Sequence, residues 1–194
     1  MIAIVDTGGA NISSVIYAIE RLGHAYKLTK DPVVIKSARR VLLPGVGAAG
    51  DSMSRLQQSE LCGTIRELER PTLGICLGMQ LLFESSEEGN AECLGILPGH
   101  VFRMKESPEV TIPHMGWNRL EWSGEPSLLK GLDQGCQVYF VHSYQAPVNA
   151  STVATTSHGA KVPAIVNKDF FWGCQFHPER SGKVGARILE NFLK

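Results

Sequence analysis

Cys76 lies in the part of the sequence best suited to nucleophilic chemistry. Residues 71–80 place an apolar, β-prone run before a Gly-x-Cys-x-Gly core, and a helical pattern follows. Gly74 and Gly78 suit a tight strand-to-helix turn, where a side chain two residues from the nucleophile could clash with a neighbouring element. Such a turn puts the sulfur at a helix N-terminus, whose N–H groups stabilise a thiolate. A buried core cysteine in a glycine-containing turn is the alternative interpretation.

His177 is the best candidate for the general base that a catalytic thiol needs. It follows a strand predicted over residues 171–176, at the strand end where parallel-sheet enzymes place their working residues. Pro178 fixes the backbone, so the carboxylate of Glu179 can turn back and accept a hydrogen bond from the imidazole. A structural histidine beside a surface glutamate is the alternative for this pair. His142 ends another strand and is a rival base, but it has no acid nearby in the sequence.

The other histidines and cysteines carry weaker signals. His114 lies in a Gly/Trp segment that favours loop architecture, and Cys174 is expected in the core. Three further histidines are expected to face solvent in turns: His24, His100 and His158. The five cysteines are odd in number and widely spaced, without a Cys-x-x-Cys pair or a ligand-like cluster. We therefore expect no zinc site, no disulfide framework and no cofactor.

The glycine loop at residues 45–50 matches Gly-x-Gly-x-x-Gly literally. A dinucleotide site is a weak interpretation, because the loop follows the third predicted strand and Pro44 ends that strand abruptly. In addition, no strand ending in an acid appears about 20 residues further on, where the ribose partner belongs. A flexible loop that turns backbone N–H groups toward an adjacent site is the better interpretation.

Length and charge limit the classes of function. A chain of 194 residues is enough for one domain with a real core, and we expect a single domain over residues 1–194. Lys plus Arg and Asp plus Glu each number 19, so no global charge attracts nucleic acid or an acidic membrane. The first residues have the pattern of an apolar strand that ends at the acidic Asp6, which is not the pattern of a signal peptide. No apolar run is long enough to span a membrane. We expect a reduced, cytoplasmic enzyme.

The elements that position these residues alternate in the first half of the chain. Strands are predicted at residues 2–6, 25–28, 40–43 and 72–75, and helical periodicity runs over residues 12–22 and 53–68. This rhythm predicts a parallel sheet that is covered on both faces.

The second half is richer in strands. β-type patterns cover residues 94–104, 110–120, 138–144, 152–155, 164–166 and 170–176. The links between them are too short for helical crossovers, so most pairing should be antiparallel. An amphipathic helix beginning near Ser181 ends the chain. The fold class is therefore α/β.

Together these motifs resemble a known family. Residues 44–47, 74–80 and 175–181 are similar to the three signatures of the class I (triad) glutamine amidotransferases. Residues 6–11, 113–118 and 139–144 narrow the resemblance to the glutaminase subunits of imidazole glycerol phosphate synthase, in histidine biosynthesis. The resemblance covers essentially the whole chain and departs from the pattern at no catalytic position. It implies a flavodoxin-like three-layer fold: a mixed, largely parallel sheet flanked by helices, with an antiparallel extension.

The resemblance implies a reaction and a role for each site residue. Cys76 attacks the carboxamide of glutamine, His177 acts as base and then as acid to the leaving ammonia, and Glu179 orients His177. The oxyanion donors are the N–H of Leu77 and the loop at Gly45, Val46 and Gly47. Glutamine itself is recognised by Gln80, Glu88, Ser143 and Tyr144.

The resemblance also implies a partner. The chain has no room for a second catalytic domain, so the ammonia passes to a (β/α)8-barrel synthase subunit in a heterodimer. Candidate interface residues are Asn11, Trp117, Tyr139 and Arg180, although Trp117 and Tyr139 could instead belong to the core. No contact with nucleic acid or membrane is expected.

Two other functions are compatible with parts of this pattern. One is a glutaminase subunit of another synthase, in pyridoxal phosphate or aminodeoxychorismate synthesis, which residues 113–118 argue against. The other is a non-catalytic binding module of the same fold, but such relatives usually lose the cysteine or the His–Glu pair.

Overall fold

Strand β1 (Ile2–Val5) is buried along its whole length, which shows that the central sheet is covered on both faces. Successive side chains of a strand point to opposite faces. Ile2 and Ile4 accordingly pack in one hydrophobic cluster, whereas Ala3 and Val5 pack in another. A computed structural model describes residues 1–8 and 12–194 of the chain.

The central sheet has eight strands in the order β2-β1-β3-β4-β14-β13-β12-β9. The first five run parallel: β2 (Tyr26–Thr29), β1, β3 (Arg40–Gly45), β4 (Thr72–Cys76) and β14 (Phe171–Cys174). The remaining three pair antiparallel: β13 (Ala160–Lys168), β12 (Thr152–His158) and β9 (Glu121–Trp122). The predicted mixed, largely parallel sheet is confirmed.

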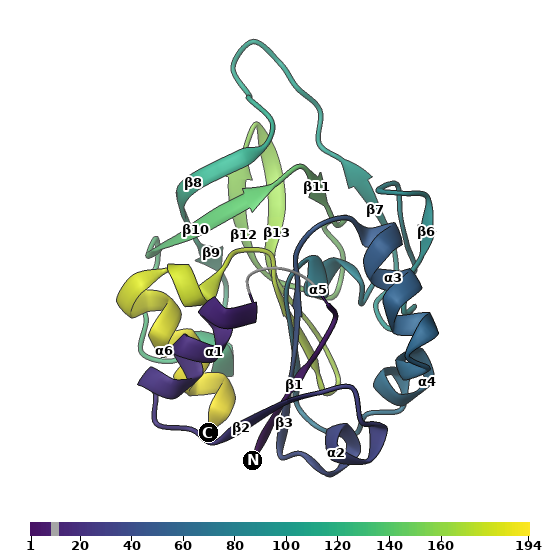
Figure 1. Ribbon diagram of the computed structural model, residues 1–194. Helices are drawn as coiled ribbons and strands as arrows, with labels where there is room; N and C mark the ends of the chain where they lie inside the picture. Colours follow the sequence, from purple (N-terminus) through teal and green to yellow (C-terminus); the bar gives the residue numbers. More distant parts are fainter. Residues whose placement is uncertain (9–11) are drawn as a thin grey trace.

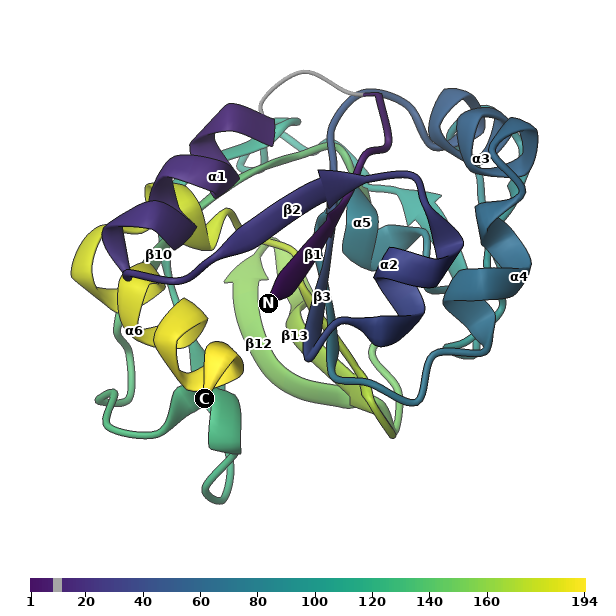
Figure 2. The same cartoon turned by 60° about the horizontal axis from the view of Figure 1, so that its bottom comes forward.

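Helices form a layer on each side of this sheet (Figures 1 and 2). One layer holds α1 (Ile12–Arg21) and α6 (Gly182–Leu193). The other holds α2 (Pro32–Ser37), α3 (Ala49–Gln58) and α4 (Leu61–Arg66). Within the described ranges, no helix is long and apolar enough to cross a membrane.

Two helical predictions need correction. The single helix expected over residues 53–68 is two helices, because Glu60 takes a left-handed conformation with φ of 56° between α3 and α4. The helix after the elbow is also shorter than its pattern indicated, since α5 (Leu77–Gln80) is a single turn.

Shorter strands build the antiparallel extension. β10 (Gln137–His142) pairs with β8 (His114–Arg119), so His114 lies in a strand and not in the expected loop. A four-stranded sheet joins β11 (Tyr144–Gln145), β7 (His100–Arg103), β5 (Ser85–Ser86) and β6 (Ala91–Glu92). Two short 3-10 helices, η1 (Ser127–Leu129) and η2 (Pro178–Arg180), complete the fold.

Candidate active site

Cys76 occupies a strained turn between β4 and α5. Its φ of 54° and ψ of −111° are unusual for a residue with a side chain, at a typical cost of about 1–3 kcal/mol. A Cβ on Gly78 would collide with the carbonyl oxygen of Leu43, and a Cβ on Gly74 would lie 2.6 Å from the carbonyl oxygen of Gly78. The predicted elbow is therefore present, and its two glycines are required by close backbone approach.

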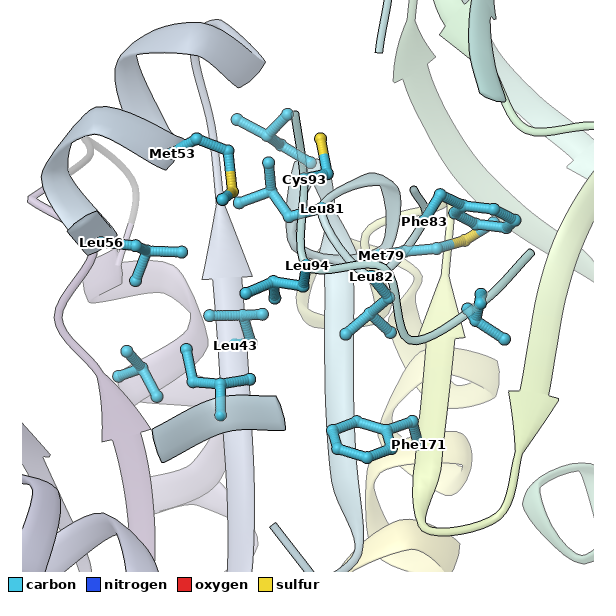
Figure 3. Packing of buried hydrophobic residues seen from close by; sticks show 14 of the residues in the cluster. Leu43, Met53, Leu56, Met79, Leu81, Leu82, Phe83, Cys93, Leu94 and Phe171 are labelled. Carbon is cyan, nitrogen blue, oxygen red and sulfur yellow. The ribbon is translucent and has the colours of Figure 1, made fainter. Parts of the chain in front are cut away.

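Core packing holds the elbow in this conformation. Met79, Leu81, Leu82 and Phe83 follow the turn and are completely buried on the α3–α4 side of the sheet (Figure 3). Burying a side chain of this size contributes roughly 1.5–3 kcal/mol. The burial of these four side chains outweighs the backbone strain at Cys76, so the sulfur keeps a fixed place at the carboxyl end of β4.

His177 and Glu179 come together at the end of β14, the strand next to β4. The η2 turn brings Glu179 back toward the ring, and Nδ1 of His177 lies 2.7 Å from Oε1 of Glu179. Their side chains are only 5% and 1% exposed, so this is a buried pair and not a surface glutamate beside a histidine. An Nδ1–H that donates to the carboxylate leaves Nε2 available on the other side of the ring.

Ser181 fixes the backbone of His177, a role that sequence reasoning missed. Its Oγ donates to the carbonyl oxygen of His177 at 2.7 Å and accepts from the N–H of Tyr139 at 2.9 Å. The N–H of His177 in turn donates to the carbonyl oxygen of Tyr139 at 2.9 Å. A serine four residues after the histidine, before a helix, was the available signal.

The environment of His177 favours its protonated form. Burial lowers the pKa of His177, but the hydrogen bonds to Cys76 and Glu179 and the charges of these two groups have the larger, opposite effect. The net result is a pKa raised to about 10. The imidazole thus holds a proton between two acidic partners. A protonated imidazole next to a cysteine is the arrangement that nucleophilic cysteine chemistry requires.

A pocket of about 200 Å³ opens beside the sulfur. Its lining includes all four residues expected to recognise the substrate, three of the four expected oxyanion residues and the Cys–His pair: Gln80, Glu88, Ser143, Tyr144, Val46, Gly47, Leu77, Cys76 and His177. Gly45 is not part of the lining, but it pairs with Cys76 across β3 and β4. Residues from separate segments of the chain therefore meet at one cavity.

Gln80 and Gln175 form a buried amide pair under this pocket. Nε2 of Gln80 donates to the carbonyl oxygen of Tyr144 at 2.9 Å and to Oε1 of Gln175 at 3.0 Å. The amide nitrogen of Gln80 is thus used by the scaffold. Gln175 also places its Nε2 at 4.0 Å from the sulfur of Cys76, a contact that was not expected from the sequence.

His142 lines the pocket but is hydrogen-bonded away from the role of base. Nδ1 donates to the carbonyl oxygen of Tyr144 at 2.8 Å, so Nε2 accepts from Nδ1 of His114 at 2.9 Å. Nε2 of His114 then accepts from Asn118 at 3.1 Å. Burial lowers the pKa to about 4 for His142 and to about 3 for His114, so both rings are neutral at pH 7.

His158 also differs from its expected place. It lies on β12, stacks on His114 with ring centroids 4.2 Å apart, and pairs Nε2 with the carbonyl oxygen of Thr111 at 2.8 Å. It is therefore part of the histidine cluster and not a solvent-facing turn residue.

Two of the candidate interface residues, Trp117 and Tyr139, lie side by side on the β8–β10 ladder. Trp117 is 54% exposed, so the core alternative is wrong for this residue, and it meets half-buried Tyr139 edge to face with centroids 6.1 Å apart. Met115 adds another exposed apolar side chain on the same strand. Arg180 is exposed in η2, and Asn11 lies outside the described residues.

Comparison with known proteins bears on the whole chain. Residues 3–194 match the family model described as "Glutamine amidotransferase class-I". The chain is 54% identical over 193 residues to "Imidazole glycerol phosphate synthase subunit HisH" of Xanthomonas oryzae pv. oryzae (strain MAFF 311018), covering 100% of this chain and 96% of that protein. A protein of the same name from Xylella fastidiosa (strain Temecula1) is 49% identical with the same coverage.

Solved structures support the fold. A chain described as "Crystal structure of glutamine amidotransferase" superposes with a TM-score of 0.74 at 18% identity, covering 99% of this chain and 96% of the other. A glutamine amidotransferase from Thermotoga maritima gives a TM-score of 0.64 at 18% identity, covering 99% of this chain and 81% of the other. At these identities the likeness concerns architecture alone.

Proposed function

We propose that this chain, which belongs to the class-I glutamine amidotransferase family, hydrolyses glutamine through a cysteine thioester. The Cys76 thiolate attacks the carboxamide carbon of glutamine and forms a tetrahedral intermediate. Protonated His177 then gives its Nε2 proton to the leaving nitrogen, so ammonia departs and a γ-glutamyl thioester remains. Neutral His177 next removes a proton from water, which attacks the thioester carbonyl and releases glutamate. Glu179 keeps the imidazole oriented through Nδ1.

The negative charge of each tetrahedral intermediate needs two N–H donors. The N–H of Leu77 is one, because it begins α5 directly after the nucleophile. The loop at residues 45–47 supplies the second. Gly47 has φ of +94°, which glycine adopts without strain, so a peptide of this loop can flip between inactive and active orientations. A glutamine complex with no loop amide near the oxyanion would contradict this assignment.

Glutamine lies in the pocket with its carboxamide at the sulfur. Glu88 suits the α-ammonium group, because it is the acidic side chain among the described residues that line the pocket. Ser143 and Tyr144, which follow β10, contact the other end of the substrate, and Gln80 supports that wall from below.

The chain acts as the glutaminase subunit of imidazole glycerol phosphate synthase, in histidine biosynthesis. Relatives with that name match it along its entire length at about half identity, which supports this pathway over pyridoxal phosphate or aminodeoxychorismate synthesis. We propose that residues 1–194 work as one glutaminase domain. A cytoplasmic location stays a prediction.

The proposed partner is a (β/α)8-barrel synthase subunit. It receives ammonia through a protected channel and converts a phosphoribulosyl-carboxamide ribonucleotide to imidazole glycerol phosphate and an aminoimidazole carboxamide ribonucleotide. The docking surface that we propose consists of the exposed side chains of Met115 and Trp117, of Tyr139 against Trp117, and of exposed Arg180. Exposed aromatic and arginine side chains are typical anchors of such interfaces.

The observation that carries the proposal is the buried His177–Glu179 pair beside a strained, pocket-lining Cys76. The test is Cys76→Ser in the assembled synthase, supplied with either glutamine or ammonium salt. Glutamine hydrolysis should vanish, whereas synthesis from free ammonia should continue. Cys62→Ser, at a half-buried cysteine outside the pocket, is the matched control and should keep both activities. Glutamine hydrolysis by Cys76→Ser would show that the mechanism is wrong.

A further inference from the structure

Helix α3 begins without a capping side chain of its own. Ala48 occupies the N-cap position in an extended conformation, with φ of −96° and ψ of 146°, and alanine offers no acceptor for the first-turn N–H groups. The acceptor comes from a residue 39 positions along the chain: Oε2 of Glu88 accepts from the N–H of Ala49 at 2.9 Å. A pocket residue thus completes the start of this helix.

The turn that carries Glu88 is itself fixed. The N–H of Glu88 donates to Oγ of buried Ser86 at 3.1 Å, and Ser86 belongs to strand β5. Gly89 packs directly on the first turn of α3, since a Cβ added to it would lie 3.2 Å from Cα of Gly50. The backbone that carries the Glu88 carboxylate is therefore held in place next to Ala49.

This helix start is continuous with the proposed oxyanion loop. Gly45 is fixed in the sheet by its pairing with Cys76, and only Val46, Gly47 and Ala48 separate it from Ala49. Val46 and Gly47 line the pocket together with Glu88. The loop is thus held at one end by β3 and at the other end by the Glu88–Ala49 hydrogen bond.

We infer that Glu88 has two tasks: it attracts the substrate's α-ammonium group and, through Ala49, it is a positioning residue for the oxyanion loop. This inference rests on the proposed function. An ionised carboxylate has four lone-pair sites, so accepting from Ala49 leaves capacity for an ammonium group. Occupancy of the glutamine site and the position of the loop are then coupled through one side chain.

The local charges give the direction of this coupling. Burial raises the pKa of Glu88, the Ala49 N–H lowers it, and the charge of Asp51 raises it again. An ammonium group in the pocket favours the ionised carboxylate, and that form accepts the Ala49 N–H most strongly. Bound glutamine should therefore tighten the start of α3, and by reciprocity a tight α3 should favour glutamine binding.

Three variants of the assembled synthase separate the two tasks in steady-state glutamine hydrolysis. Glu88→Gln keeps an oxygen acceptor for Ala49 but loses the charge, so KM should rise about tenfold or more while kcat stays within about threefold. Glu88→Ala loses both, so kcat should also fall about tenfold or more, as expected for a misplaced donor. Ala48→Ser combined with Glu88→Ala supplies an N-cap oxygen to the N–H of Gly50 or Asp51, which holds the helix start by a different bond, so kcat should recover while KM stays high.

The controls separate this inference from simple unfolding. Glu92→Gln removes an exposed carboxylate of β6 and should leave kcat and KM unchanged, and Ala48→Ser alone is the reference against which the double variant is compared. Thermal unfolding midpoints establish that each variant folds. Equal kcat in folded Glu88→Gln and Glu88→Ala, or no recovery on adding Ala48→Ser, would overturn the positioning role. Failure of the proposed function looks different, because Cys76→Ser would then still hydrolyse glutamine.

Discussion

The buried pair His114 and His142 should make the protein lose stability as the pH falls below neutrality. Both rings are nearly inaccessible, and the chain of hydrogen bonds from Asn118 to Tyr144 uses one donor and one acceptor of each. A proton added to Nε2 of His142 would face the Nδ1–H of His114, so two donors would meet. A proton added to Nε2 of His114 would face the amide N–H of Asn118 in the same way. The pKa of each is therefore held well below 6.5, at about 3 and about 4.

The magnitude follows from proton linkage. At pH 5.5 an unfolded histidine with the ordinary pKa of about 6.5 is about nine-tenths protonated, which favours the unfolded chain by about 1.4 kcal/mol for each histidine that stays neutral when folded. A group with a depressed folded pKa loses stability below the unfolded pKa, so the loss runs from about pH 6.5 downward. The two rings together should cost about 3 kcal/mol at pH 5.5.

The pKa shift of His177 changes stability with pH in the opposite direction. Its folded pKa is raised to about 10, so its contribution is complete below pH 6.5 and is lost as the pH rises toward 10. Acidification from pH 7.5 to 5.5 therefore gains stability at this ring. Because His177 is present in both the wild type and a His114 variant, its effect cancels in the difference between them.

The assay is urea unfolding of the wild type and His114→Asn at pH 7.5 and pH 5.5. Asparagine keeps a donor near the position of Nδ1 but does not titrate. The variant will be less stable at both pH values, because it loses the stacks on Phe140 and His158. Its drop in stability between the two pH values should be smaller than that of the wild type by about 1.4 kcal/mol.

That difference corresponds to about 0.5–1 M in the midpoint at ordinary urea m-values. His24→Gln removes a histidine outside the cluster and is the control, so its drop should match that of the wild type. An identical drop in His114→Asn and the wild type would refute the reasoning, because His114 would then titrate alike in the folded and unfolded states.

Two further predictions concern support of the base and docking. Ser181→Ala removes the donor to the His177 carbonyl and the acceptor of the Tyr139 N–H, so kcat for glutamine hydrolysis should fall about tenfold with KM little changed, measured by steady-state kinetics. Trp117→Ala should weaken binding to the proposed barrel partner by about thirtyfold or more in a titration, whereas labelling of Cys76 by a glutamine-like electrophile should persist. Unchanged affinity would exclude Trp117 as an anchor.

The parts of the site that the sequence predicted are those encoded over a few residues. The elbow around Cys76 depends on Gly74 and Gly78, and the structure shows the close backbone contacts that require them. The His177–Glu179 contact depends on a single short turn. Such local geometry can be predicted from a sequence, because the few residues between the groups limit the distance between them.

The parts that the sequence did not predict depend on distant segments. His114 follows a proline and lies close to a glycine, a loop-like context, yet it is buried by His142 across the β8–β10 ladder and by His158 from β12. The break between α3 and α4 was hidden for a different reason. A left-handed glutamate, Glu60, makes it, and no glycine or proline marks the position.

The order of the strands explains why three motifs spread along most of the chain form one site. In the sheet, β4 lies between β3 and β14, and all three are parallel, so their carboxyl ends share an edge. Cys76 pairs with Gly45 on one side, while Ile75, one residue earlier, pairs with Cys174 on the other. The loop after β3 and the histidine after β14 therefore flank the sulfur. A shift of one residue in either ladder would turn the pocket-side groups to the opposite face. The register of the core strands, which hydrophobic burial fixes, therefore also fixes the geometry of the proposed catalytic residues.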